Sequence, residues 1–241
     1  MAAASEEPRI SVDFLPVLDC REETPGPLYV QPSQQRSDGT SLDAASLLTA
    51  GTEGKGFNEP LVRRNLETVV NAGLRKAEAL SGEGQGRKVI IPLNGVALAK
   101  KAIAGDFANL CRSASEKSRS HVVFEVTNLL DEQRMSFLDD VAIVLYPFCQ
   151  EYHARVSLKS QSFKVYATCN YTGISVDLLN KPWPLDAVGP HMKSLFARAE
   201  ESRLKVCVHG VGNSKLAEFF RELGVHYMSG EGVSLREKRA G

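Results

Sequence analysis

Apolar residues alternate between a strand pattern and a helix pattern along most of the chain. Short runs of β-branched and aliphatic residues lie at 88–93 (KVIIPL), 121–126 (HVVFEV) and 204–209 (LKVCVH). Such runs are typical of strands that are covered on both faces. Between them, apolar residues recur every three or four positions, as on the buried face of a helix. This alternation predicts a mostly parallel sheet with helices packed outside it.

The same pattern gives the expected extent of each element. Strands are predicted at 10–18, 26–30, 88–93, 121–126, 153–158, 174–177, 204–209 and 225–228. Helices are predicted at 42–48, from Glu59 to about 77, and at 97–114, 131–148, 187–201 and 214–223, with Gly224 ending the last one. The segment 32–56 is rich in Ser, Gly and Gln and is expected to be mostly loop around the short helix. Two leading strands and some six strand–helix units favour a closed barrel over an open sheet.

Composition narrows the class of protein further. The 241 residues carry 29 Lys plus Arg and 29 Asp plus Glu, so the cationic excess of a nucleic-acid binder is lacking. The five cysteines are widely spaced and form no CxxC pair, so we expect neither a disulfide framework nor a zinc site. Buried thiols in a reducing cytoplasm are the plain interpretation. No signal peptide opens the chain, and the apolar run at 141–149 is too short to span a membrane. We expect a single cytoplasmic domain over 1–241, with a flexible N-terminus (1–8), a flexible basic tail (235–241) and no membrane insertion.

Four stretches, taken in order, resemble landmarks of the EAL family of cyclic-di-GMP phosphodiesterases. FLPVLDCR (14–21) resembles the opening strand of the family, and VVFEVTNLL (122–130) resembles its ExTE strand. GISVDLLN (173–180) resembles the KID strand, and residues 204–230 follow the pattern of AEGVE, a helix and LGxxxxQG. The order and spacing agree over nearly the whole chain. The resemblance implies an α/β fold, namely a modified (β/α)8 TIM-like barrel with one early strand antiparallel to the others.

Active members of this family resemble two-metal phosphodiesterases, whose carboxylate-rich site lies at the C-terminal ends of the barrel strands. The resemblance implies that Glu125 and Asp177 are kept here, whereas most other motif positions are replaced. In the first half of the chain, Val30 stands at the name-giving glutamate, Gln34 near the phosphate-binding arginine, Pro92 at the asparagine ligand and Asn128 at the second ExTE acid. Lys159 and Ser160 stand at the paired aspartates, and Ser175 stands at the KID lysine. In the last stretch, His209 and Gly212 stand at the glutamates of AEGVE, and Ser229 stands at the QG glutamine. Lys159 would place a cation where a divalent ion should bind. We therefore expect a degenerate member with no catalytic residue, no metal and no cofactor.

Several of these residues allow two interpretations. Glu125 is either a surviving metal ligand or a strand-end carboxylate paired with a cation such as Lys159. Asp177 is either catalytic or a polar strand end that caps the following backbone. His209 is either a general base or a structural residue. The segment HGVGNSK (209–215) is either a phosphate loop or a tight turn capped by Asn213 or Ser214.

These observations lead to a ranked set of functions. The first is an inactive EAL-like domain that acts as a regulatory or scaffold binding protein in bacterial cyclic-di-GMP-type signalling, with another protein as its partner or with itself as a homodimer. The alternative is a receptor that binds cyclic-di-GMP without hydrolysing it. An active phosphodiesterase, or another barrel enzyme built on His209, Glu125 and Asp177, ranks lower. The segment 32–56 is the first candidate for partner contacts.

Overall fold

The computed structural model describes residues 10–35, 41–42, 44–50, 57–84, 86–129 and 134–234. The N-terminus (1–8) and the basic tail (235–241), both expected to be flexible, lie outside the described residues. The same is true of much of the segment 32–56, for which partner contacts were expected.

The strands form one mixed sheet that closes on itself. They are β1 (Ile10–Asp19), β2 (Thr24–Gln35), β3 (Ser41–Leu42), β4 (Val89–Asn94), β5 (Val122–Thr127), β6 (Glu151–Arg155), β7 (Gly173–Asp177), β8 (Lys205–His209) and β9 (Tyr227–Met228). The order β1-β9-β8-β7-β6-β5-β4-β2-β3 is closed into a barrel by the pairing of β1 with β2. Strand β1 is antiparallel to both of its neighbours, whereas β2 and β4 to β9 are parallel to one another. The expected modified barrel with one early antiparallel strand is therefore confirmed.

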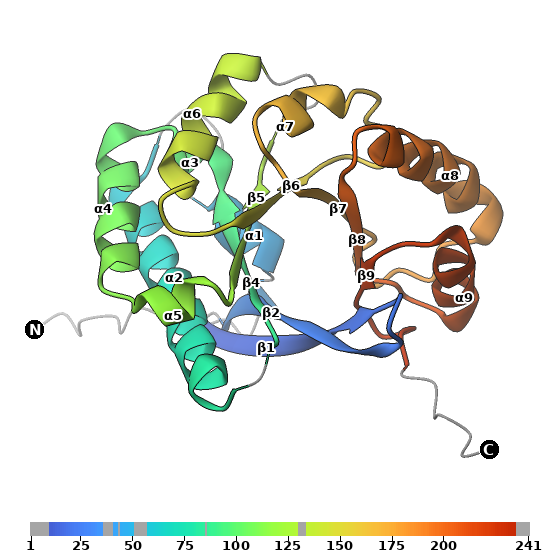
Figure 1. The fold of residues 1–241 in the computed structure, drawn as a ribbon, viewed down its shortest axis with the longest axis horizontal. Coiled ribbons are helices and arrows are strands. Elements are labelled where there is room, and N and C mark those ends of the chain that lie inside the picture. Colours follow the sequence, from blue (N-terminus) through green and yellow to red (C-terminus); the bar gives the residue numbers. More distant parts are fainter. Residues whose placement is uncertain are drawn as a thin grey trace, which may run out of the picture.

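Helices surround the barrel (Figure 1). They are α1 (Ala44–Thr49), α2 (Glu59–Gly82), α3 (Gly95–Leu98), α4 (Lys101–Arg112), α5 (Glu116–Arg119), α6 (Met135–Leu145), α7 (Lys164–Thr168), α8 (Leu185–Glu201) and α9 (Ser214–Leu223). The long helix α2 begins where the Asn58 side chain accepts a hydrogen bond from the backbone of Leu61. Helix α9 ends at Gly224, whose left-handed φ of 87° confirms the expected stop.

Strand β6 spans Glu151–Arg155 and not 153–158 as expected. The structure differs from the sequence expectation at three further places. Strand β2 continues to Gln35, so residues 32–35 are strand and not loop, because they pair with the start of β1. The helix expected at 97–114 is divided into α3 and α4, because Lys100 has an extended backbone between them. Helix α7 lies in the segment 161–181, where the pattern indicated little more than a strand.

Two apolar regions follow from the alternation of side chains along each strand. Most core residues lie between the barrel and its helices in one large cluster. A second, small cluster of Val17, Tyr29, Ile90 and Val123 is separate from it. Because Tyr29 pairs with Ile90 and Ile90 with Val123, these residues point to the same side of the sheet, which is the barrel interior. Only a small part of the core therefore lies inside the barrel.

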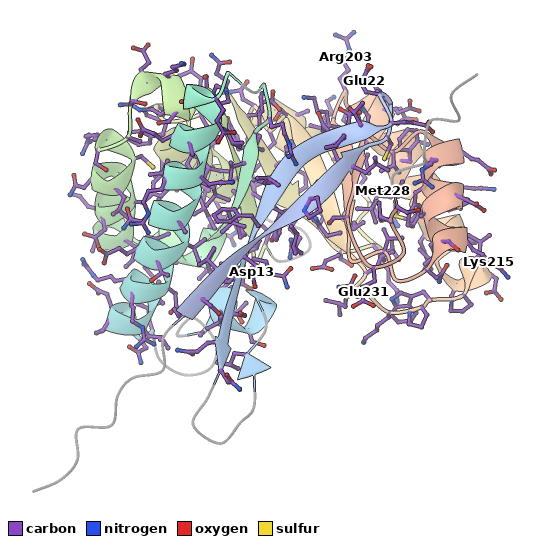
Figure 2. All side chains as sticks on the ribbon, turned by 90° about the horizontal axis from the view of Figure 1, so that it is seen from below. Asp13, Glu22, Arg203, Lys215, Met228 and Glu231 are labelled. Carbon is purple, nitrogen blue, oxygen red and sulfur yellow. The ribbon has the colours of Figure 1, made fainter. Side chains whose placement is uncertain are left out.

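The two ends of the barrel are seen in Figure 2, where Glu22 and Arg203 lie at one end and Lys215 and Glu231 at the other. Arg203 precedes β8 and Lys215 follows it, so the second end is where the parallel strands finish. We call this end the mouth and the opposite end the base. Among the described residues, no helix combines the length and the apolar character that a membrane crossing requires.

Candidate functional site

A buried carboxylate forms the centre of a polar network inside the barrel, near the mouth. The side chain of Glu125, on β5, is fully buried. Its Oε2 accepts hydrogen bonds from Arg155 Nη2 at 2.7 Å and from the Tyr29 hydroxyl at 3.2 Å. Its Oε1 lies 3.0 Å from Nε2 of His209. Both carboxylate oxygens are thus bonded to groups from other strands.

Arg155, the last residue of β6, joins the two carboxylates that the sequence retains. Its Nη2 also donates to the Tyr29 hydroxyl at 2.8 Å, and its Nη1 donates to Asp177 Oδ2 at 3.1 Å. The other Asp177 oxygen, Oδ1, accepts the backbone N–H of Leu179 at 2.8 Å. The guanidinium therefore bridges Glu125 and Asp177, and Asp177 also caps the turn after β7.

The imidazole of His209, on β8, is held on three sides. Its Nδ1 lies 3.0 Å from the Ser229 hydroxyl, and its Nε2 lies 3.4 Å from Cys207 Sγ as well as close to Glu125. Its ring packs against Tyr29 with the ring centroids 4.5 Å apart. Because both ring nitrogens have polar neighbours in the protein, the structural interpretation of His209 accounts for its burial.

Opposite charges stabilise the ionised forms of this network. Burial alone would raise the pKa of Glu125, but Arg155 and His209 outweigh it and hold that pKa well below its ordinary value. Burial alone would lower the pKa of His209, but Cys207 and Glu125 outweigh it and raise that pKa to about 10. At neutral pH an ionised Glu125 therefore lies between the Arg155 guanidinium and a protonated His209.

This arrangement leaves little for a divalent ion to bind. A metal such as Mg²⁺ needs several oxygen ligands, and each oxygen of Glu125 and Asp177 already accepts a hydrogen bond. In the described parts of the chain, no group of three or more His, Cys, Asp or Glu side chains is arranged to hold a metal ion. Binding at this point would require displacement of the Arg155 guanidinium and would add an uncompensated charge inside the barrel.

The structure places two residues of the expected motif set elsewhere than expected. Lys159 is exposed beyond the end of β6, so its expected pairing with Glu125 is wrong: Arg155, which points into the barrel, is the cation there. Val30 is buried on the outer face of β2, where it adjoins Ile91 of β4 and Gly73 of α2. The alternation of β2 turns Tyr29, not Val30, toward Glu125.

The other expected positions are spread between the barrel interior and the loops. Pro92 and Ser175 are buried in strands, with Pro92 opposite Glu125 and Ser175 beside Arg155 and Cys207. Gln34 is buried in β2, Ser160 lies in the turn after β6, and Asn128 follows β5 with a left-handed φ of 55°. Gly212 is needed for space, because a Cβ there would lie 2.4 Å from the carbonyl oxygen of Lys181. Thus His209, Glu125, Asp177 and Ser229 are brought together, whereas Lys159, Ser160, Asn128 and Gly212 are not part of the network.

The turn at 209–215 fits the capping interpretation. The Asn213 side chain accepts the backbone N–H of Leu216 at 2.9 Å and begins α9. This is one of the two caps that the sequence allowed.

Sequence reasoning missed Tyr29, Arg155 and Cys207. A usable signal was present at Arg155, because an arginine within an otherwise apolar barrel strand must find a buried partner. Counting every second residue along β5 and β6 from Glu125 would have placed His153 and Arg155 on the interior face. Tyr29 had no such signal, because the motif resemblance directed attention to Val30.

The closed barrel with one antiparallel strand and polar residues at its mouth defines the fold class as that of EAL domains. A phosphodiesterase structure, PaMucR in complex with c-di-GMP, superimposes with a TM-score of 0.72 at 14% identity, over 92% of this chain and 89% of that one. An EAL domain protein from Listeria monocytogenes gives a TM-score of 0.68 at 11% identity, over 92% and 85%. The FimX EAL domain of Pseudomonas aeruginosa bound to c-di-GMP gives 0.62 at 16% identity, over 92% and 88%.

At these identities the likeness establishes the fold. No protein-family model matches the chain, and no curated protein matches it.

Proposed function

We propose that the chain is a catalytically inactive EAL-like barrel that acts as a regulatory or scaffold binding protein in bacterial cyclic-di-GMP-type signalling. The observation that carries this proposal is the Arg155 guanidinium, which bridges Glu125 and Asp177 at the mouth. The similar structures include an enzyme described as a phosphodiesterase, and two of them are described with c-di-GMP bound. The fold is shared with these EAL structures, but a shared fold does not by itself carry over an activity, so the proposal depends on the residues at this mouth.

The charges at the mouth are unsuited to two-metal hydrolysis. Two-metal hydrolysis requires cations that activate a water molecule and stabilise the leaving oxygen. A guanidinium supplies a positive charge but has no open coordination position, and its high pKa prevents it from acting as a base. Beside it, His209 is held protonated by its surroundings, so it is also a poor general base at neutral pH.

The outer surface supports a protein partner. Helix α6 exposes 54% of Met135, 64% of Ile143 and, just beyond its end, 73% of Tyr146. Ile143 and Tyr146 are three residues apart on one face, and Met135 lies two turns before Ile143 with the exposed Asp139 between them. Exposed apolar side chains grouped in this way favour contact with another protein or with a second copy of the chain.

The test is a hydrolysis assay with cyclic-di-GMP in the presence of Mg²⁺ and of Mn²⁺, using an active EAL phosphodiesterase as the positive control. The proposal predicts no turnover above the protein-free reaction with either metal. Turnover that the Glu125→Gln variant abolishes would contradict it, because that result would make Glu125 a metal ligand.

A non-hydrolysing receptor remains the second candidate, and the loop after β7 favours it. Trp183 is 40% exposed there, and Lys181 Nζ lies 5.6 Å from the centre of its ring. An aromatic face beside a cation suits a nucleotide, because the base can stack on the ring while a phosphate meets the ammonium.

Trp183 is the only tryptophan of the chain, so its fluorescence reports this interaction directly. A saturable change on addition of cyclic-di-GMP without metal, weakened in the Lys181→Gln variant, would promote the receptor over the scaffold. An unchanged spectrum, together with no heat of binding in calorimetry, would eliminate it.

A further inference from the structure

A second hollow lies at the base, at the opposite end of the barrel from the network around Glu125. It is a cavity of about 280 Å³ between the turn that joins β1 to β2 and the residues that precede β4. Its position corresponds to the end where Glu22 and Arg203 lie in Figure 2. Its polar lining includes Arg87, Lys88, Glu151 and His153. The volume corresponds to about nine water molecules at about 30 Å³ each, which is the size of a small metabolite.

His153 is the first unusual feature of this cavity. Its side chain is only 2% exposed, yet neither Nδ1 nor Nε2 has a hydrogen-bond partner among the described residues. The ring packs over Gly173, where a Cβ would lie 2.8 Å from Nε2, so the absence of a side chain there makes room for the imidazole. Burial lowers the pKa of His153 to about 4, so at neutral pH the ring offers one donor and one acceptor.

Arg87 is the second unusual feature. Its Nε donates to the carbonyl oxygen of Gly26 at 2.8 Å, which fixes the guanidinium at the base. Its Nη2 is buried and has no partner in the described chain. Unpaired buried donors are costly, so a guanidinium and an imidazole left unpaired in one cavity point to a molecule that bonds to both.

The remaining charges of the cavity balance one another, with two ammonium groups against two carboxylates. Glu151 accepts hydrogen bonds from Lys88 and, at 3.1 Å, from Lys205. The second carboxylate is that of Asp19, which accepts the backbone N–H groups of Arg21 at 3.0 Å and of Glu22 at 3.2 Å. In the described lining, the guanidinium of Arg87 therefore supplies the positive charge that is left for a ligand. The site therefore favours a single negative charge.

We propose that the base cavity binds a small hydroxy- or keto-monocarboxylate, whose carboxylate meets Arg87 and whose oxygen substituent bonds to His153. A planar carboxylate matches the fork of a guanidinium, and the neutral imidazole can donate to a keto oxygen or accept from a hydroxyl. The cavity lies on the base side of the mouth network, where His153 pairs with Glu125 of the neighbouring strand. The proposed binding does not depend on whether the mouth is catalytically inactive.

The experiment uses the full chain with ¹⁵N-labelled histidine and follows the ring signals of His153 by NMR. Pyruvate, lactate, acetate and inorganic phosphate are the probes. We expect pyruvate or lactate to shift the His153 signals saturably with a Kd of about 1 mM or lower, and acetate to bind more weakly because it lacks the second oxygen group. The surface residue His191 serves as the internal control whose signals stay unchanged.

Two variants assign the binding to this cavity. Arg87→Gln, at a half-buried position, should weaken pyruvate or lactate binding about tenfold or more, because it removes the charged donor. The matched exposed variant Arg112→Gln should leave the Kd unchanged. The proposal is overturned if none of the four probes shifts the His153 signals, if phosphate binds as tightly as the carboxylates, or if Arg87→Gln binds as the parent does.

Discussion

The two ends of the barrel interior contrast in how they satisfy their buried polar groups. At the mouth, Arg155 and His209 come from two different strands and both bond to Glu125 on a third. Every oxygen of Glu125 and Asp177 is bonded there, although Arg155 Nε and the Ser175 hydroxyl have no partner among the described residues. At the base, neither ring nitrogen of His153 has a partner in the described chain, and one nitrogen of Arg87 is also buried without one. The same barrel thus encloses one cluster whose carboxylate oxygens are all bonded and another whose imidazole is unbonded.

The difference shows what a buried charge requires when no ion or ligand is bound to it. A buried carboxylate is tolerated when cations and donors on neighbouring strands replace its hydration, as Arg155, Tyr29 and His209 do for Glu125. A cluster whose carboxylate oxygens are all bonded has little capacity for a further cation. The base, where His153 and Arg87 Nη2 have no partner among the described residues, retains capacity for a ligand, which is why we assign ligand binding to it.

The largest effect is expected for Arg155→Met. The substitution replaces the arginine by an unbranched apolar side chain and leaves Glu125 and Asp177 without their shared cation. Breaking a buried ion pair in this way costs about 3–5 kcal/mol, measured as the loss in free energy of unfolding in urea. The exposed Arg112→Gln variant should change it by less than about 0.5 kcal/mol. A loss below about 1 kcal/mol for Arg155→Met would mean that the network does not stabilise the mouth.

The next effect is a fall in the free energy of unfolding as the pH rises, and it is expected from His209. The folded-state pKa of His209 is raised from 6.5 to about 10, so its contribution to stability is complete below pH 6.5 and is lost as the pH rises toward 10. The free energy of unfolding should fall across this window by up to about 1.4 kcal/mol per pH unit. His209→Gln should remove that slope, which urea titrations at several pH values would reveal. An equal slope in both proteins would assign it to another group.

Lowering the pH should also destabilise the folded protein, in this case through Glu125. Because the pKa of Glu125 is lowered in the folded state, its contribution is present above its ordinary value of 4.5 and is lost as the pH falls below it. The Glu125→Gln variant should therefore lose less stability between pH 5 and pH 3, as about one fewer proton is taken up on unfolding. A parallel decline of the two proteins would show that Glu125 is not held ionised.

A smaller effect is expected for Tyr29→Phe. The hydroxyl accepts from Arg155 at 2.8 Å and donates to Glu125 at 3.2 Å, while the ring keeps its contact with His209. Its removal should cost about 1–2 kcal/mol in free energy of unfolding. The control is Tyr146→Phe, at the exposed end of α6, which should be neutral. Equal values for the two variants would exclude a role for the Tyr29 hydroxyl in the network.

The smallest effect is expected at the base. His153→Leu removes a buried ring whose two nitrogens are unpaired, so the gain from relieving them offsets most of the lost packing. The free energy of unfolding without added ligand should change by less than about 1 kcal/mol, in contrast to Arg155→Met. A loss as large as that of Arg155→Met would show that His153 has polar partners in solution and would remove the contrast between the two ends.

The sequence predicted the strands and helices well because their patterns are local, whereas the barrel with one antiparallel strand was expected from the resemblance to the EAL family. The buried strands, the helix faces and the stop at Gly224 each depend on residue types within one turn or one strand. Strand β2 was underestimated because the polar residues 32–35 resemble a loop, and only their pairing with β1 makes them a strand. That pairing is a tertiary fact that the local pattern does not contain.

The site was predicted less well, because it depends on which way each side chain faces. Glu125, Asp177 and His209 were identified as candidates, and they do lie in one network. Their cation was misassigned to Lys159, because proximity in the aligned motif was used where strand alternation places Arg155 inside the barrel. A shift of one residue likewise separates the outward Val30 from the inward Tyr29.

If Arg155 and His209 take the place of divalent cations at the mouth, the protein should not bind Mn²⁺ there. Electron paramagnetic resonance distinguishes free from bound Mn²⁺ in a titration of the full chain. We expect the protein to leave the free-ion signal unchanged, and Glu125→Gln to behave in the same way. One equivalent of Mn²⁺ bound by the parent protein and lost in Glu125→Gln would contradict this expectation.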